Sequence, residues 1–319
     1  MTAWRAYDAA ADEQWDALVA EAPMGTFLHT RRFLGYHGGR FVDRSLLLLD
    51  DRSRLVAVFP AAQDPDDARR AVSHPGSTYG GLVHRGDLVG AAAVRVLEAV
   101  RDAYAAAGAD LLLYKAVPHI YHRSPSADDI YALYRLGGRL VRCDLSCAID
   151  LGERRPRTER RRRGERKAAK HGVTVASGPD RVAELWPVVE ENLAREHDAR
   201  PTHTLAELDL LLSLFPDAIE IVAATLDGSV VAGVVLFKSP RVVHAQYIAS
   251  SKVGRDVSAL DAVFEHCIEH ARQAGARFFD FGISTEDAGR VLNETLYKFK
   301  SEFGGGGVAH EFFELELGP

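Results

Sequence analysis

Cysteines, long apolar runs and export signals are scarce or absent in this sequence. The three cysteines, Cys143, Cys147 and Cys267, are too few and too unevenly spaced for a disulfide framework or a zinc site. No run of about 18 apolar residues occurs, and the first residues, MTAWRAYD, lack the apolar stretch of a signal peptide. We therefore expect a cytoplasmic protein without a membrane span.

Fingerprints for nucleotide and metal binding are missing as well. The glycines at 304–307 follow an expected helix instead of opening one, which is the wrong context for a phosphate loop. Residues 266–270 have the H-x-x-E-H spacing of some zinc peptidases. The apolar stripe of that helix passes through Val263, Phe264 and Cys267, so both histidines should point away from it. We expect no metal and no resident cofactor.

The composition is that of a large folded protein. Apolar residues make up 47% of the 319 residues and charged residues 26%, with a formal net charge of −6. These proportions allow a sizeable core and argue against wholesale disorder. The length is about twice that of a typical domain, so two domains or one duplicated unit is expected.

An internal duplication determines the expected architecture. Four features recur in the same order: an amphipathic stretch opening at Trp15 and Trp186, a His-Thr pair at His29 and His203, a hairpin turning at Asp51 and Asp227, and a helix closed by Gly108 and Gly275 and followed by a strand. The members of these pairs lie 171, 174, 176 and 167 positions apart. The order predicts two α/β halves with mixed sheets, 1–150 and 151–319. A cleft between such halves is a usual place for a ligand.

The densest charge lies at the junction of the halves. Residues 154–170 contain ten basic and two acidic residues, and residues 158–171 have a composition compatible with a helix that Gly172 would end. A solvated helix is one interpretation. The other is a phosphate- or RNA-binding surface, because the patch is strongly basic within a chain of net charge −6. Its candidate residues are Arg160, Arg161, Arg162, Arg163, Arg166 and Lys167.

Several segments resemble one family of enzymes. These segments are VPHIYHRSP at 117–125, RRRRGERKAAKHGVTV at 160–175, AQYIASS at 245–251, FFDFGIST at 278–285 and LNETLYKFKSEFG at 292–304. Together they are similar to the Fem-type and BioF2-like acyltransferases of the GNAT superfamily. The resemblance implies two tandem GNAT-like domains. It also implies transfer of an aminoacyl group from aminoacyl-tRNA to an acceptor amine.

The resemblance suggests catalytic residues near the C-terminus. Phe299-Lys300 matches a Phe-Lys pair whose lysine is thought to stabilise the donor or the developing oxyanion, as a fixed cation does; Lys298 is an alternative. Asp280, at the end of an apolar strand, and Glu286, in the next loop, are candidates to deprotonate the acceptor amine. Asp280 would otherwise cap a turn.

Other polar residues are candidates for substrate binding. Tyr247 matches a strand tyrosine that contacts the acceptor in Fem-type relatives, although a core aromatic is the alternative. Asn293 would orient a substrate carbonyl or cap a helix. In the first half the candidates are Ser77, Thr78 and Tyr79 in a glycine-rich loop, and His119, Tyr121, His122 and Arg123 before the junction. Both segments have a plain alternative, as a long turn and a rigid connection.

The acyl donor is the open question. GNAT enzymes that use acyl-CoA hold its pyrophosphate with R/Q-x-x-G-x-G/A, and the corresponding stretch here has only Gly254. Ser258 and Asp261 are expected to form a capping box for the next helix. Lys252 and Arg255 lie nearby, so this helix start remains a possible phosphate site.

Three hypotheses for function remain. The leading one is direct attack of an amine on aminoacyl-tRNA, with a small molecule or peptide as the acceptor. The second is an acyl-CoA-dependent N-acetyltransferase acting on an amino sugar or a small amine. The third is a catalytically silent module that binds RNA or phosphate.

Overall fold

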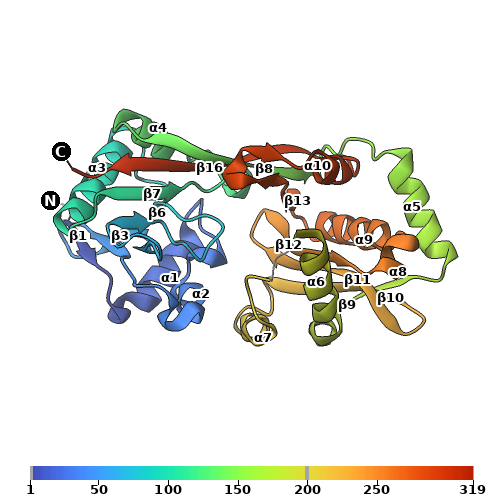
Figure 1. Ribbon diagram of the computed structural model, residues 1–319. Coiled ribbons are helices and arrows are strands. Elements are labelled where there is room, and N and C mark those ends of the chain that lie inside the picture. The colour runs from blue at the N-terminus through green and yellow to red at the C-terminus, as the bar shows by residue number, and fades with distance from the viewer. Residues whose placement is uncertain (1–2, 198–200, 319) are drawn as a thin grey trace. The chain divides into compact units, whose positions relative to one another are not determined.

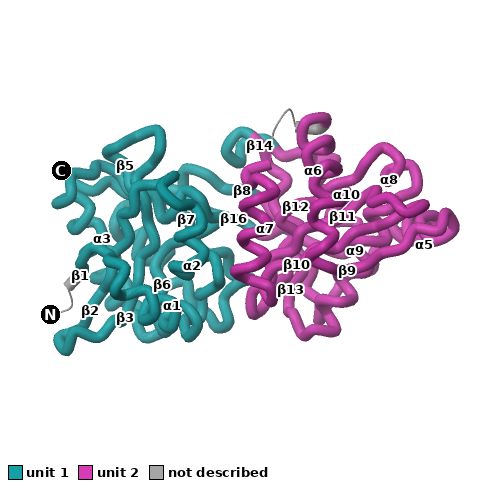
Figure 2. Tube along the Cα trace, turned by 90° about the horizontal axis from the view of Figure 1, so that it is seen from below, with its two compact units in different colours: residues 1–144, 287–291, 309–319 teal, residues 145–286, 292–308 magenta. Residues whose placement is uncertain are grey.

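The computed structural model describes residues 3–197 and 201–318. The chain forms two compact units, shown in different colours in Figure 2. Unit 1 comprises residues 1–144, 287–291 and 309–319, and unit 2 comprises residues 145–286 and 292–308.

This division differs from the expected one at Asp150. The C-terminal residues 309–319 belong to unit 1 because Phe312–Glu316 pair antiparallel with Leu111–Lys115. The last segment, HEFFELEL, carries alternating apolar residues suited to a half-buried strand. A pairing between segments so far apart in sequence cannot be recognised from either segment alone.

The elements of unit 1 follow the predicted α/β order. They are β1 (Ala3–Ala6), α1 (Asp12–Glu21), α2 (Arg31–Leu34), β2 (Leu46–Leu49), β3 (Leu55–Phe59), β4 (Ala62–Gln63), β5 (Arg70–Val72), β6 (Val83–His84), α3 (Ala91–Ala106), β7 (Leu111–Lys115) and α4 (Asp128–Arg135). Strands β1, β2, β3 and β6 form an antiparallel sheet in that order. The core of unit 1 includes Phe59 of β3, Tyr104 of α3 and Tyr114 of β7, which are all buried.

Unit 2 contains the larger set of elements. After β8 (Arg139–Asp150), which begins in unit 1, come α5 (Glu159–Lys170), β9 (Thr174–Ser177), α6 (Val182–His197), α7 (Leu205–Leu214), β10 (Ile219–Leu226), β11 (Ser229–Lys238), β12 (Val242–Ser250), α8 (Lys252–Asp256), α9 (Ala259–Gln273), β13 (Phe278–Ile283), β14 (Thr285–Glu286) and α10 (Glu294–Ser301). Strand β15 (Val291–Leu292) begins in unit 1, and β16 (Gly306–Glu316) begins in unit 2 and continues into unit 1. Among the residues described, no helix combines the length and apolar character needed to cross a bilayer.

The sheet of unit 2 runs in the order β8-β13-β12-β11-β10-β9 and is antiparallel except between β12 and β13 (Figure 1). Helix α9 covers one face, where Val234 belongs to the core, and α6 covers the other. Strand β11 is therefore buried on both faces and has a nearly continuous apolar sequence. At Gly233 a β-carbon would lie 2.8 Å from Leu185 of α6, so glycine permits this close approach.

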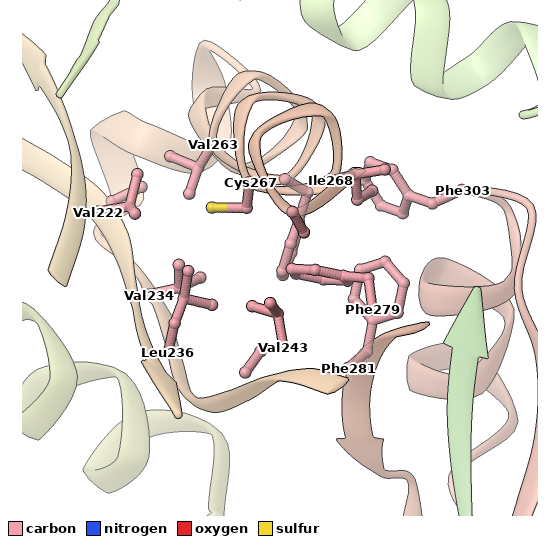
Figure 3. Close-up of a cluster of buried hydrophobic side chains, with 14 of the residues drawn as sticks. Val222, Val234, Leu236, Val243, Val263, Cys267, Ile268, Phe279, Phe281 and Phe303 are labelled. Atoms are coloured by element: carbon pink, nitrogen blue, oxygen red, sulfur yellow. The ribbon is translucent and has the colours of Figure 1, made fainter. Parts of the chain in front are cut away.

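Phe264 lies at the centre of the unit 2 core. Figure 3 shows the surrounding cluster, with Cys267 and Ile268 of α9 pointing toward the strands. The ring of Phe264 is fully buried and packs 4.9 Å from Phe281 and 5.3 Å from Phe303, measured between centroids.

Removing this ring should destabilise the protein strongly. We expect Phe264→Ala to lower the free energy of unfolding by about 3–5 kcal/mol, because contacts are lost and a cavity remains. Tyr134→Ala, at a side chain that is 76% exposed, should change it by less than about 0.5 kcal/mol. Denaturant unfolding of both variants tests this, and equal effects would contradict the central position of Phe264.

The structure confirms the duplication. Helices α1 and α6 carry the buried Trp15 and Trp186, and the hairpins β2–β3 and β10–β11 follow in each unit. Asp227 and Gly228 have φ angles of 49° and 80°, as a two-residue hairpin turn requires. The predicted basic helix is α5, and Gly172 after it has a φ of 78°.

Candidate functional site

Three polar side chains share the face of the unit 2 sheet that points away from α9. In β13, Phe279 and Phe281 belong to the core beneath α9, so the residue between them, Asp280, faces the other side. The same alternation places His244 of β12 and Ser146 of β8 on that side. His244 and Asp280 are also register partners in the parallel β12–β13 pair, which brings them side by side.

Asp280 is a fully buried carboxylate whose oxygens are all hydrogen-bonded. Its Oδ2 lies 2.8 Å from Nδ1 of His244. Its Oδ1 accepts hydrogen bonds from the hydroxyl of Ser146 and, at 3.0 Å, from the backbone N–H of Gly282. These partners offset the cost of burying the charge and fix the orientation of the imidazole.

Lys300 of α10 reaches the end of the same strand. Its Nζ donates to the carbonyls of Gly282 at 3.0 Å and Ile283 at 2.6 Å, and the residue is only 3% exposed. Burial lowers the pKa of Lys300 to about 8, an effect that the nearby carboxylate of Asp280 partly offsets. An ammonium has three N–H donors, so one remains beyond the two carbonyl contacts.

We call Ser146, His244, Asp280, Gly282 and Lys300 the β13 cluster. It combines a carboxylate-bound imidazole with a buried cation. The His244 side chain is 13% exposed, whereas that of Asp280 is fully buried. With Nδ1 directed at Asp280, Nε2 is the imidazole nitrogen left to exchange a proton with a substrate. Gly282 has a φ of 75° and lies beside this ring, so a side chain there would be strained.

A basic pocket is the second feature of unit 2. The cavity has a volume of about 360 Å³ and lies between α5 and the start of α8 and α9. Asp261 is the single carboxylate among its lining residues. Five cationic side chains also line it, namely Arg160, Arg161, Arg163, Lys167 and Arg255. We call this cavity the basic pocket.

The basic pocket collects only some of the predicted phosphate-binding residues. Arg162 and Arg166 lie on another side of α5 and pair with Glu159, at 3.5 Å in the case of Arg162. Lys252 is exposed and does not line the cavity.

A buried ion-pair network joins the basic pocket to α10. Arg161, 5% exposed, lies 3.1 Å from both Asp261 of α9 and Glu302. Its guanidinium also stacks over the ring of Phe299, 4.7 Å from the centroid. The expected capping box was wrong, because Ser258 adopts a left-handed conformation without a side-chain cap and Asp261 pairs with Arg161 instead.

Three other candidates near the C-terminus lie in α10 or next to its first turn. Asn293 caps the helix by accepting from the N–H of Leu296 at 3.0 Å, and it donates to Glu286 at 3.0 Å. Glu286 is exposed. Phe299 packs against Phe264, with ring centroids 6.0 Å apart, so its observed contacts are those of a packing residue.

Tyr247 faces the same side of the sheet as His244 because the β11–β12 register skips Gln246. Its hydroxyl lies 2.7 Å from Nδ1 of His203, and its ring packs edge-on against Trp186. The observed contacts therefore tie the segment before α7 to the sheet.

The glycine-rich loop of unit 1 wraps around a lysine. Lys115 is buried and donates to the carbonyls of His74, at 3.1 Å, and Ser77. Tyr79 is also buried and its hydroxyl donates to Thr26, whereas Thr78 is half-buried.

The segment before the junction is packed against α1. Arg123 donates to the carbonyls of Ala20 and Ala22, both at 2.6 Å. Tyr121 and His122 are buried, and His119 is exposed. The structure places the unit 1 candidates in two neighbouring segments of that unit.

No set of three or more His, Cys, Asp or Glu side chains within residues 3–197 and 201–318 is arranged to hold a metal. In the H-x-x-E-H segment, Glu269 is bound by Arg272 and Gln273.

Sequence reasoning missed His244, Ser146 and the role of Asp261. The available signal was a polar residue inside an apolar strand, VVHA at 242–245 and LSCA at 145–148. Such residues need a buried partner. The partner of His244 lies 36 positions away on another strand.

A family model matches part of the chain. Residues 155–298 match the model described as an acetyltransferase (GNAT) domain. This stretch contains the basic pocket and all of the β13 cluster except Ser146 and Lys300. No curated protein matches the sequence.

Solved structures match the whole chain in fold. FemX is 13% identical with a TM-score of 0.69, covering 98% of this chain and 97% of that one. The C-terminal domain of a putative lysylphosphatidylglycerol synthetase from Agrobacterium fabrum is 16% identical with a TM-score of 0.64, over 97% and 92%. A tandem GNAT protein from the clavulanic acid biosynthesis pathway is 11% identical with a TM-score of 0.55, over 100% and 99%. The predicted tandem GNAT architecture is confirmed.

Proposed function

We propose that this chain, an acyltransferase of the GNAT type with Fem-like architecture, transfers an aminoacyl group from aminoacyl-tRNA to an acceptor amine. The observation that carries the proposal is the basic pocket, where five cations surround a cavity of about 360 Å³. A phosphate-rich donor fits such a lining. The pocket lies in the same unit as the β13 cluster, and Glu302 of the network adjoins the helix that carries Lys300.

The donor end would bind with its phosphates in the basic pocket. Arg160, Arg163 and Lys167 offer exposed charges on one side of α5, while Arg161 is buried. Phosphate contacts of this kind position a nucleic acid without reading its sequence. The chain has a net charge of −6, so the attraction is local to this surface.

The chemistry would take place at the β13 cluster. His244 accepts a proton from the acceptor ammonium, and Asp280 keeps its imidazole in the required tautomer. The free amine attacks the ester carbonyl, and Lys300 stabilises the oxyanion that forms. The attacking nitrogen then gives its second proton to solvent, the ester C–O bond breaks, His244 returns the first proton to the ribose oxygen, and the neutral amide is released. No covalent enzyme intermediate is needed.

The test compares two labelled donors. Purified protein is incubated with labelled aminoacyl-tRNAs or labelled acetyl-CoA and a pool of small amines. We expect incorporation from the tRNA pool that RNase treatment abolishes. Incorporation from acetyl-CoA alone would replace this proposal with a conventional N-acetyltransferase.

Paired variants of α5 sharpen this test. Arg163→Ala with Lys167→Ala removes two charges from the basic pocket and should raise KM for aminoacyl-tRNA about tenfold. Arg162→Ala with Arg166→Ala removes the same charge from the same helix outside the pocket and should change KM by less than about twofold. Equal effects of the two pairs would point to nonspecific attraction.

A further inference from the structure

Asp261 is an unexpected lining residue for a phosphate-binding cavity. It is 6% exposed and contributes a carboxylate to a pocket that otherwise presents five cations. Its Oδ1 lies 3.1 Å from Nη1 of Arg161, yet accepts no hydrogen bond from residues 3–197 or 201–318. A β-carbon at Gly164 would lie 2.4 Å from the carboxyl carbon, so glycine in α5 makes room for this group.

Another carboxylate of α9 pairs with arginines that do not line the cavity. Glu265, one turn further along α9, pairs with Arg154 at 2.6 Å and Arg157 at 2.8 Å. Arg161 already has Glu302 as a second partner at 3.1 Å. Two carboxylates, Asp261 and Glu302, therefore face the single positive charge of Arg161, and the excess negative charge opposes an anion that enters the cavity.

We infer that Asp261 is a specificity-determining residue that lowers the basic pocket's preference for doubly charged terminal phosphates relative to singly charged phosphodiesters. The inference rests on the proposed binding of donor phosphates in this pocket. A phosphodiester carries one charge, whereas a phosphomonoester carries nearly two at neutral pH. Repulsion by one carboxylate is proportional to the charge of the ligand. RNA backbone phosphates are diesters, while coenzyme A bears a terminal 3′-phosphate.

The geometry also defines the electrostatic setting of Asp261. Burial raises the pKa of its carboxyl to about 6, although Arg161 and Arg160 of α5 act against this. Glu302 raises the pKa further, and Arg255 of α8 lines the same cavity. At pH 7.5 the group is ionised and repels anions, and at pH 5 it is mostly neutral.

The test measures binding of two adenosine probes by calorimetry at pH 7.5. The dinucleotide CpA carries one phosphodiester with one charge, and adenosine 3′-monophosphate carries one terminal phosphate with nearly two. At about 6 Å in water, one charge changes affinity about threefold for each ligand charge. Asp261→Asn should therefore strengthen binding of CpA about threefold and of the monophosphate about tenfold. Glu265→Gln, the matched control on the same helix, should change neither.

Equal gains for both probes, or no gain, would overturn the inference. Failure of the proposed function has a different signature, because RNase-sensitive incorporation from aminoacyl-tRNA would then be absent while Asp261→Asn still strengthened binding of the two probes unequally. If Asp261→Asn does not fold, sulfate binding to wild-type protein replaces it. Sulfate stays doubly charged between pH 7.5 and 5, so its affinity should rise as Asp261 takes up a proton near pH 6. An unchanged affinity would overturn the inference.

Discussion

Replacing Lys300 by alanine should lower kcat for acyl transfer by about 10²- to 10³-fold. The ammonium is buried at the end of β13, where two carbonyls hold it in place before the reaction. A preorganised cation stabilises an oxyanion without reorganising at the moment of attack. Single-turnover transfer from a fixed aminoacyl-tRNA, with saturating acceptor, measures the effect on the chemical step.

The neighbouring lysine provides the control. Lys298 is exposed on the same helix, and Lys298→Ala should change kcat by less than about twofold. If Lys298→Ala lost activity and Lys300→Ala did not, stabilisation of the oxyanion would belong to Lys298. Circular dichroism of both proteins separates a missing charge from a damaged helix.

The pH dependence separates a catalytic from a structural role for Lys300. Its pKa in the folded protein is about 8, against 10.5 for an ordinary lysine, so the cation is lost as pH rises through about 8. Activity should decline there. Deprotonation of Lys300 should not lower the free energy of unfolding, because the folded state binds fewer protons than the unfolded state between about pH 8 and pH 10.5. A decline in activity without unfolding would therefore show that the charged form of Lys300 is needed for catalysis.

The fold could be predicted from sequence where signals are local or repeated. The hairpin at Asp227-Gly228, the helix ended by Gly172 and the order of elements in both halves depend on patterns within a few residues. Their recurrence about 170 positions apart added evidence that no single element provides. The return of β16 to unit 1 has no local signal, because it depends on pairing with β7.

The candidate site was harder to predict from the sequence for the same reason. Asp280 was identified as a candidate base at the end of an apolar strand, but its partner could not be identified, because the parallel register of β12 and β13 sets the contact with His244. Asp261 has the spacing of a capping residue relative to Ser258, and only the packing of α5 against α9 shows that it faces Arg161 instead. Sequence spacing predicts contacts within an element, whereas these sites are made between elements.

The pairing of His244 with Asp280 leads to the second large effect. Asp280→Asn keeps the shape of the side chain but replaces an acceptor with an amide, so the imidazole loses its fixed tautomer. We expect kcat to fall by about 10²- to 10⁴-fold, with a small change in KM, and His244→Gln to give a loss of similar size. Steady-state kinetics of the single variants and of the double variant measure this.

The double variant decides whether the two residues act as one unit. If Asp280 acts only through the imidazole, Asp280→Asn combined with His244→Gln should be no slower than His244→Gln alone. If instead Asp280 itself took the proton, as the sequence suggested, the losses would multiply and His244→Gln would remain active. Full burial of Asp280 beside a partly exposed His244 favours the first outcome, because of these two residues the imidazole is the one that a substrate can contact.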